Sequence, residues 1–87
     1  MGAITLEKSK TETELINVAK TRVKSFPANW VKLHYSEEVD SLFVQISKEK
    51  IANSTHDFEN DVIYNYDEKS LLVSFEILDL FGIFVTV

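Results

Sequence analysis

Three residue types are scarce in this chain of 87 residues, which has no cysteine, one proline and two glycines. Without cysteine it can form no disulfide, no thiolate zinc site and no thiol nucleophile. Two glycines are too few for a glycine-rich loop that cradles phosphate. A chain this short buries only about 60–65% of the surface of its unfolded state. It must therefore rely on a small core or on self-association, and we expect a homodimer.

Long apolar runs are also missing. The opening residues, MGAITLEKSK, lack the apolar stretch of a signal peptide. The most apolar segment, residues 71–87, is interrupted by Glu76, Asp79 and Gly82 and is too short to span a bilayer. We therefore expect a cytoplasmic protein without membrane contact.

The net charge of −5 is divided unevenly along the chain. Residues 1–35 carry six basic and three acidic side chains, a net +3, whereas residues 36–87 carry three basic and eleven acidic ones, a net −8. This division favours a mildly basic helix docked on an acidic sheet. An acidic sheet repels phosphate, so nucleic acid is not an expected partner, although Lys20, Arg22 and Lys24 lie close together in the sequence.

An amphipathic helix is predicted over residues 11–26. Thr11 and Glu14 have the spacing of a capping box, and Pro27 restricts the residue before it and ends the helix. Residues 1–10 are expected to form a flexible or edge segment. The apolar side of the helix repeats every three or four residues, at Leu15, Ile16, Ala19, Val23 and Phe26.

After residue 29 the apolar pattern changes to a period of two, which is typical of strands. The connections are two to six residues long, which permits hairpins and is too short for parallel crossovers. The sequence therefore predicts one α+β domain over residues 1–87, with the N-terminal helix packed on an antiparallel β-meander of five or six strands over residues 30–87. The expected strands are WVKLHY, SLFVQIS, a weak IANSTHDF, VIYNY, LLVSFEIL and a short final IFVTV.

The strand over residues 71–78 is apolar at both parities. Leu72 and Leu78 stand on the second parity with a single acid, Glu76, and Phe43 occupies a similar place on an earlier strand. A sheet with one face in water should be apolar on one parity only. Two interpretations stay open: the second face meets a partner, most simply a second copy, or the sheet curls and both faces are covered within one chain. The first makes Phe43, Leu72, Glu76 and Leu78 candidate interaction residues.

Two segments carry a distinctive pattern, HYSEEVDSLFVQIS at 34–47 and DVIYNYDEKSLLVSFEIL at 61–78. A strand led by Tyr35 enters an acidic turn that ends in Asp40, and an apolar strand follows. Over residues 33–79 the chain resembles domain-of-unknown-function family 2283, a family of small prokaryotic proteins. Further matching positions are Leu42, Phe43, Val44, Ile63, Tyr66, Asp67, Val73, Glu76, Ile77 and Leu78.

This resemblance has two departures, because Ser70 and Ser74 stand where the family has glycine. Serine is small enough to pack closely at position 74 but is strained wherever φ is positive. The resemblance implies a compact β-rich domain whose biochemical role is unassigned, with members similar to accessory or antitoxin-like proteins. It implies protein binding and supplies no catalytic residues.

Glu76 is the residue of most chemical interest, because it is an acid within the apolar run SFEIL. It could act with His34 or His56 as a general base or a metal ligand. The two histidines lack HxH or HxxxH spacing, so we expect no metal and no cofactor. Our first hypothesis is a non-catalytic protein-interaction module that acts as a homo-oligomer or binds another protein. The alternative is a small hydrolase or metal-dependent enzyme that uses Glu76 with His34 or His56.

Overall fold

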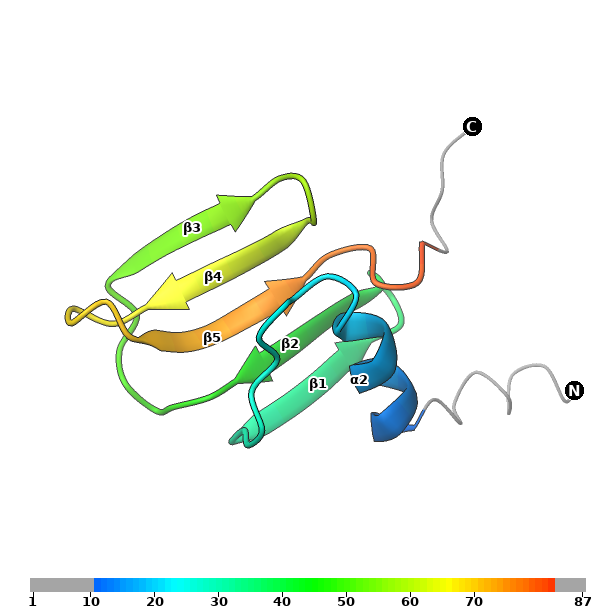
Figure 1. Ribbon diagram of the computed structural model, residues 1–87, viewed down its shortest axis with the longest axis horizontal. Coiled ribbons are helices and arrows are strands. Elements are labelled where there is room, and N and C mark those ends of the chain that lie inside the picture. Colours follow the sequence, from blue (N-terminus) through cyan, green and yellow to red (C-terminus); the bar gives the residue numbers. More distant parts are fainter. Residues whose placement is uncertain (1–10, 83–87) are drawn as a thin grey trace, which may run out of the picture.

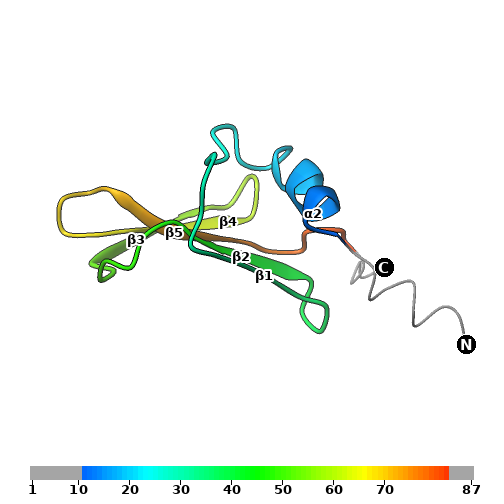
Figure 2. The ribbon, with the colours of Figure 1, turned by 90° about the horizontal axis from the view of Figure 1, so that it is seen from below.

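The computed structural model describes residues 11–82 and places one helix against one face of a five-stranded antiparallel sheet (Figures 1 and 2). The predicted α+β class is confirmed. The expected first segment, 1–10, and the expected last strand, 83–87, lie outside the described residues. The elements are α2 (Glu12–Ala19), β1 (Lys32–Ser36), β2 (Ser41–Gln45), β3 (Asn53–Asp57), β4 (Val62–Tyr66) and β5 (Leu72–Ile77).

Helix α2 begins at the predicted capping box. The Thr11 hydroxyl oxygen accepts a hydrogen bond from the Glu14 amide at 3.1 Å, and the Glu14 carboxylate accepts one from the Thr11 amide at 3.3 Å. Leu15 and Ala19 are buried against the sheet. The start of the helix therefore follows from local sequence alone.

The helix ends at Ala19, so the prediction that it continues to residue 26 is wrong. After Ala19 the amides of Thr21 and Arg22 donate to carbonyls three residues earlier in the chain, and the Thr21 hydroxyl donates to the Val18 carbonyl at 2.6 Å. The Val18 carbonyl is thus occupied by Thr21, whereas a longer helix would offer it to the Arg22 amide. Lys20, Arg22 and Lys24 therefore do not lie in the last turn of the helix, which has no basic residue.

The strand order is β1-β2-β5-β4-β3, with every neighbouring pair antiparallel. The predicted sequential meander is thus wrong in one respect, since β5 lies between β2 and β4 (Figure 1). Strands β3, β4 and β5 are joined by hairpins, and β5 returns beside β2, which is the Greek-key arrangement.

A connection over residues 46–52, here called the crossover loop, carries the chain from β2 to the edge strand β3. The amides of Ile46 and Ser47 donate to the Val73 carbonyl at 2.7 and 3.1 Å, and the Ala52 amide donates to the Tyr66 carbonyl at 2.7 Å. The loop is thereby fixed across the start of β5 and the end of β4. The sequence predicted a tight connection over residues 47–50, between strands that would pair with each other.

The central position of β5 explains part of its two-sided apolar pattern. Val73, Ser74, Phe75 and Ile77 are all buried, and Phe75 and Ile77 lie in the core with residues of α2, β2 and β4. A strand with a neighbour on each side and a helix above it is the best place for the most apolar segment. The weak, polar β3 takes an edge.

A β-bulge explains the position of Leu72. Leu72 pairs with Tyr66 and Ser74 pairs with Asn65, so Val73 is an extra residue on β5. The extra residue turns Leu72 to the face that α2 covers, where it packs against the core. The prediction that Leu72 shares the second face with Leu78 is therefore wrong.

Three hairpin turns each end on a residue with positive φ: Asp40 (53°), Asp61 (54°) and Ser70 (65°). Left-handed backbone costs a non-glycine residue roughly 1–2 kcal/mol, and aspartate tolerates it better than serine does. Ser70 is thus the position where glycine would relieve backbone strain.

Replacing Ser70 by glycine should stabilise the fold by about 1 kcal/mol, since the strain disappears. Equilibrium unfolding in urea measures the change. Ser74→Gly is the matched control, because the Ser74 hydroxyl oxygen accepts a hydrogen bond from the Asn65 side chain at 3.0 Å in the sheet. We expect Ser74→Gly to destabilise, and equal effects of the two substitutions would contradict the prediction.

Candidate interaction surfaces

The sheet face opposite α2, here called the open face, has no described element packed on it (Figure 2). Its middle row places Glu76 between Phe43 on β2 and Ile63 on β4. Leu78 has the same parity as Glu76 and is half-buried. The Glu76 carboxylate accepts a hydrogen bond from the Ser41 hydroxyl at 2.6 Å. Two of the four candidate interaction residues, Phe43 and Glu76, therefore share one face, whereas Leu78 follows the end of β5.

The two histidines lie in the same row as Glu76 but not next to it. His34 pairs with Phe43, and His56 pairs with Ile63, so each histidine is two strands from Glu76. At the usual strand spacing the backbone positions are about 10 Å apart, whereas direct proton transfer needs about 3 Å. The register thus separates the groups that the enzyme hypothesis would bring together.

His56 is instead engaged with the β3–β4 turn. Its Nε2 atom lies 3.9 Å from a carboxylate oxygen of Asp61, and its ring stacks on Phe58. Within residues 11–82, no group of three or more histidine and carboxylate side chains is arranged to hold a metal ion.

Asp40 is a fully buried carboxylate that binds the segment after β5. It accepts hydrogen bonds from the Tyr35 hydroxyl at 2.6 Å, from the Phe81 amide at 3.1 Å and from the Gly82 amide at 2.9 Å. Its own backbone carbonyl accepts from the Leu80 amide at 2.9 Å. Asp40 is thus satisfied by structural donors, and sequence reasoning identified it only as a turn residue.

The hydrogen bond from the Tyr35 hydroxyl to Asp40 should make the stability of the fold depend on pH in the alkaline range. Burial, the hydrogen bond to Asp40 and the Asp40 charge raise the pKa of Tyr35 far above its usual value near 10. The folded state therefore holds this proton more tightly than the unfolded state does. Its contribution to stability is complete below pH 10 and is lost as the pH rises above 10.

We expect the free energy of unfolding of the wild type to fall more steeply above pH 10 than that of Tyr35→Phe. Urea unfolding at a series of pH values from about 8 to 11.5 measures both slopes. Burial also raises the pKa of Tyr64, so the variant keeps a smaller slope. Parallel pH dependences would show that Tyr35 does not contribute.

Arg22 holds the backbone of the same segment from the helix side. Its guanidinium donates to the carbonyls of Asn60 (3.1 Å), Leu78 (3.0 Å), Asp79 (2.5 Å) and Leu80 (3.3 Å). Arg22 is thus a structural residue, and this role could not be predicted from the sequence because its partners are backbone atoms.

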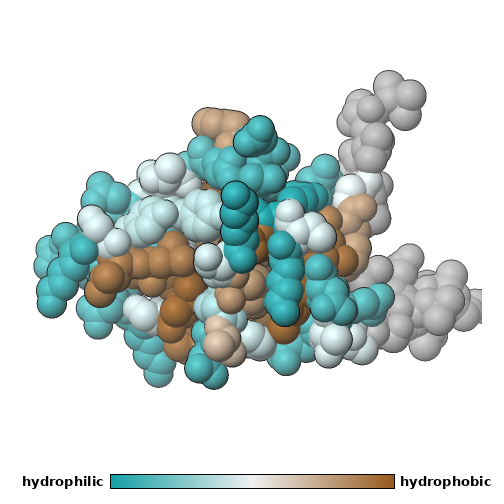
Figure 3. All heavy atoms as spheres, in the orientation of Figure 1, coloured by the Kyte–Doolittle hydropathy of each residue, from teal (hydrophilic) through white to brown (hydrophobic). Residues whose placement is uncertain are grey.

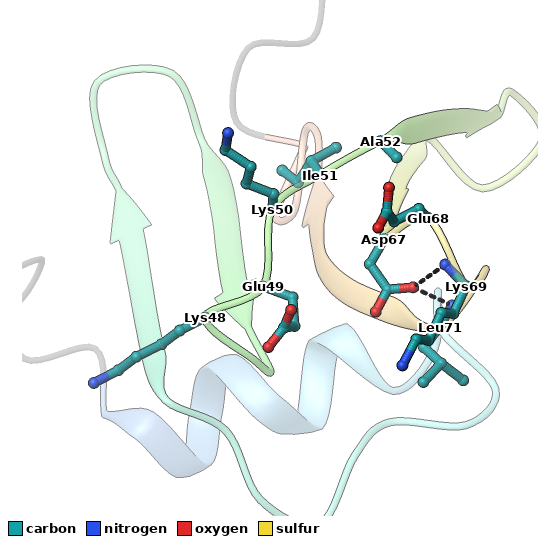
Figure 4. A pocket seen from close by; sticks show the side chains of 9 residues that line it. All are labelled: Lys48, Glu49, Lys50, Ile51, Ala52, Asp67, Glu68, Lys69 and Leu71. Atoms are coloured by element: carbon teal, nitrogen blue, oxygen red, sulfur yellow. Dashed lines mark hydrogen bonds between the residues drawn. The ribbon is translucent and has the colours of Figure 1, made fainter.

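A groove of about 710 Å³ lies between the crossover loop and the β4–β5 turn (Figure 4). All three basic residues that follow position 36 line it, together with two exposed apolar side chains, Ile51 and Leu71. Lys48 and Lys50 extend from the loop away from the turn (Figure 4). The full lining is Lys48, Glu49, Lys50, Ile51, Ala52, Asp67, Glu68, Lys69 and Leu71.

Asp67 in this lining is committed to the fold. Its carboxylate accepts hydrogen bonds from the amides of Lys69 at 2.8 Å and Leu71 at 2.9 Å, and so shapes the β4–β5 turn. The groove therefore has one rigid wall, and its exposed charges are three lysines and two glutamates.

Among residues 11–82, the large apolar side chains that stay exposed lie at the two ends of the sheet and not on the open face. Val31, Ile51 and Leu71 are at the end that carries the crossover loop, here called the crossover end. Val39 and Phe58 are at the other end, in the β1–β2 and β3–β4 turns. Figure 3 shows apolar surface over the start of β5, at the crossover end.

Charge also differs between the two ends. The basic side chains of the strands and their connections belong to the crossover end, where Glu49 and Glu68 are exposed as well; they are Lys32, Lys48, Lys50 and Lys69. The opposite end carries acidic side chains that are exposed or half-buried, and sequence analysis did not anticipate this polarity because it depends on strand direction. These are Glu37, Glu38, Asp57, Glu59, Asp61 and Asp79.

The described chain is thus a small α+β domain with a Greek-key sheet, one covered face, one open face and two ends that differ in charge. The family described as "Protein of unknown function (DUF2283)" matches residues 32–80, and the chain belongs to this family. The match runs from β1 through β5 and leaves α2 outside it, as the resemblance over 33–79 predicts.

No curated protein and no solved structure matches the chain. No helix within the described range has the length and apolar character required to cross a bilayer.

Proposed function

We propose that the protein is a non-catalytic protein-interaction module that acts as a homo-oligomer. The observation that carries the proposal is the set of large apolar side chains left in water at the ends of the sheet, of which Phe58 is 78% exposed and Leu71 is 62% exposed. In a domain with so small a core, burying such side chains against a partner would add apolar contact that the core alone does not supply. An accessory or antitoxin-like role, which the family resemblance implies, would use such a surface.

The candidate residues of the open face support the proposal less directly. Phe43 and Ile63 are half-buried on either side of Glu76, whose carboxylate accepts a hydrogen bond from Ser41, so this face has a polar centre between two apolar side chains. Such a face can stay in water or form the rim of a contact. We therefore assign the main contact to the ends of the sheet.

Sedimentation velocity of the intact chain between about 10 µM and 1 mM tests the proposal, because contacts of moderate size give dissociation constants in this range. We expect the average mass to rise with concentration. A chain that stays monomeric throughout, and that retains no protein from an extract of its own cells, would contradict the proposed function.

A further inference from the structure

The β3–β4 turn presents one aromatic side chain on a rigid support. Phe58 is the most exposed of the large apolar residues in the described range. Its ring stacks on His56 with centroids 3.9 Å apart and ring planes 26° apart. An aromatic side chain that is already held in place loses little conformational freedom on binding, which is typical of an interface anchor.

The backbone around Phe58 is fixed as well. The Asp57 carboxylate accepts hydrogen bonds from the Glu59 amide at 3.1 Å, the Asn60 amide at 3.3 Å and the Asn60 side chain at 3.0 Å. The bond from the Asn60 side chain, followed by those from the backbone, lowers the pKa of Asp57, so it is ionised at neutral pH. Phe58 therefore stands among acidic residues, with Asp57 before it and Glu59 and Asp61 after it.

The groove at the crossover end has the complementary chemistry. Ile51 and Leu71 supply apolar surface, Lys69 supplies positive charge on the turn, and Lys48 and Lys50 add positive charge where they extend outward from the loop. Within residues 11–82, none of these lysines comes within 4 Å of a carboxylate oxygen, although Glu49 and Glu68 belong to the same lining. The lysines are thus available to an acidic partner with an apolar tip.

We propose that the β3–β4 turn of one copy docks in the crossover groove of a second copy, with Phe58 against Ile51 and Leu71. The carboxylates beside Phe58 meet the lysines of the groove. This inference rests on the proposed function and names its partner surface.

The turn and the groove lie at opposite ends of the sheet, so one molecule cannot bring its own turn into its own groove. The contact is head-to-tail, and every pair keeps one free turn and one free groove. Copies therefore add in a series or close a ring. The contact is small, below about 1,000 Å², so the association is weak and decreases as salt screens the charges.

Two variants with different defects give the decisive test. Phe58→Ser removes the aromatic anchor but keeps the groove, whereas Leu71→Asp places a negative charge in the groove but keeps the turn. Each variant alone should be monomeric by sedimentation velocity at concentrations where the wild type associates. An equimolar mixture should form a one-to-one dimer and nothing larger, because only one productive contact remains.

The control is Phe43→Ser on the open face, which should associate as the wild type does. Circular dichroism checks that the variants are folded, and exposed charge reversals, Glu59→Lys for the turn and Lys69→Glu for the groove, replace any variant that is not. A mixture that stays monomeric while the wild type associates would overturn the head-to-tail contact and leave the proposed function standing. Loss of association in Phe43→Ser would overturn the head-to-tail contact and point to the open face as the interface. A wild type that is monomeric at about 1 mM would overturn the head-to-tail contact outright.

Discussion

Replacing Asp40 by alanine should lower the free energy of unfolding by about 3–5 kcal/mol. The substitution removes the buried Asp40 carboxylate. The Tyr35 hydroxyl and the amides of Phe81 and Gly82 then lose their hydrogen-bond acceptor. Each buried donor without a partner costs about 1–3 kcal/mol, and alanine is also strained at the positive φ of this position. A loss of this size is a large part of the roughly 5–15 kcal/mol that stabilises a small domain.

Equilibrium unfolding in urea measures the effect, and two variants separate its causes. Asp40→Asn keeps the shape and a residue tolerant of positive φ but removes the charge, so we expect an intermediate loss. Glu38→Ala, an exposed acid in the same turn, should change stability by less than about 0.5 kcal/mol. A loss below about 1 kcal/mol for Asp40→Ala would show that water satisfies the three donors.

The elements that the sequence predicted correctly are those set by local chemistry. The capping box of Thr11 and Glu14 fixes the start of α2, and alternation of period two locates the strands. The predicted end of α2 was wrong. The actual end depends on the Thr21 hydroxyl and on Arg22, whose guanidinium donates hydrogen bonds to carbonyls far along the chain. Helix propensity over residues 20–26 contains no information about those partners.

The order of the strands required knowledge of what each strand covers. Residues 46–52 are short enough for a hairpin, yet β3 is the most polar strand and gains least from a central place. The bulge at Val73 was equally hidden, because a period of two cannot show an extra residue. Because of that one residue, Leu72 does not lie on the open face with Phe43 and Glu76 but packs against the core.

The candidate surfaces were partly visible in the sequence. Phe43 and Glu76 share a face as their parity predicts, whereas Leu78 lies beyond the end of β5. Phe58 was overlooked, although an aromatic residue inside the acidic stretch HDFEND is itself a signal, because a turn has no reason to contain one. The groove could not be predicted, since it exists only where the crossover loop passes the β4–β5 turn.

Arg22 and Asp40 hold the same segment, residues 78–82, by opposite chemistry. The Arg22 guanidinium donates hydrogen bonds to the carbonyls of that segment, and the Asp40 carboxylate accepts hydrogen bonds from its amides. Backbone groups outside a sheet ladder must find partners when they are buried, and here two side chains supply them. This arrangement accounts for the burial of Leu80 without any regular structure around it.

Replacing Arg22 by leucine should therefore destabilise the fold by about 2–4 kcal/mol, less than Asp40→Ala because water can reach part of the guanidinium site. Arg22→Lys should recover only part of the loss, since an ammonium cannot serve four carbonyls at once. Lys24 is an exposed cation two residues after Arg22, so Lys24→Leu is the control and should leave the free energy of unfolding nearly unchanged. Because Arg22 and Asp40 act on one segment, the double variant should lose less than the sum of the single losses in urea unfolding. Strict additivity would mean that the segment is held by two independent contacts and does not release as a unit.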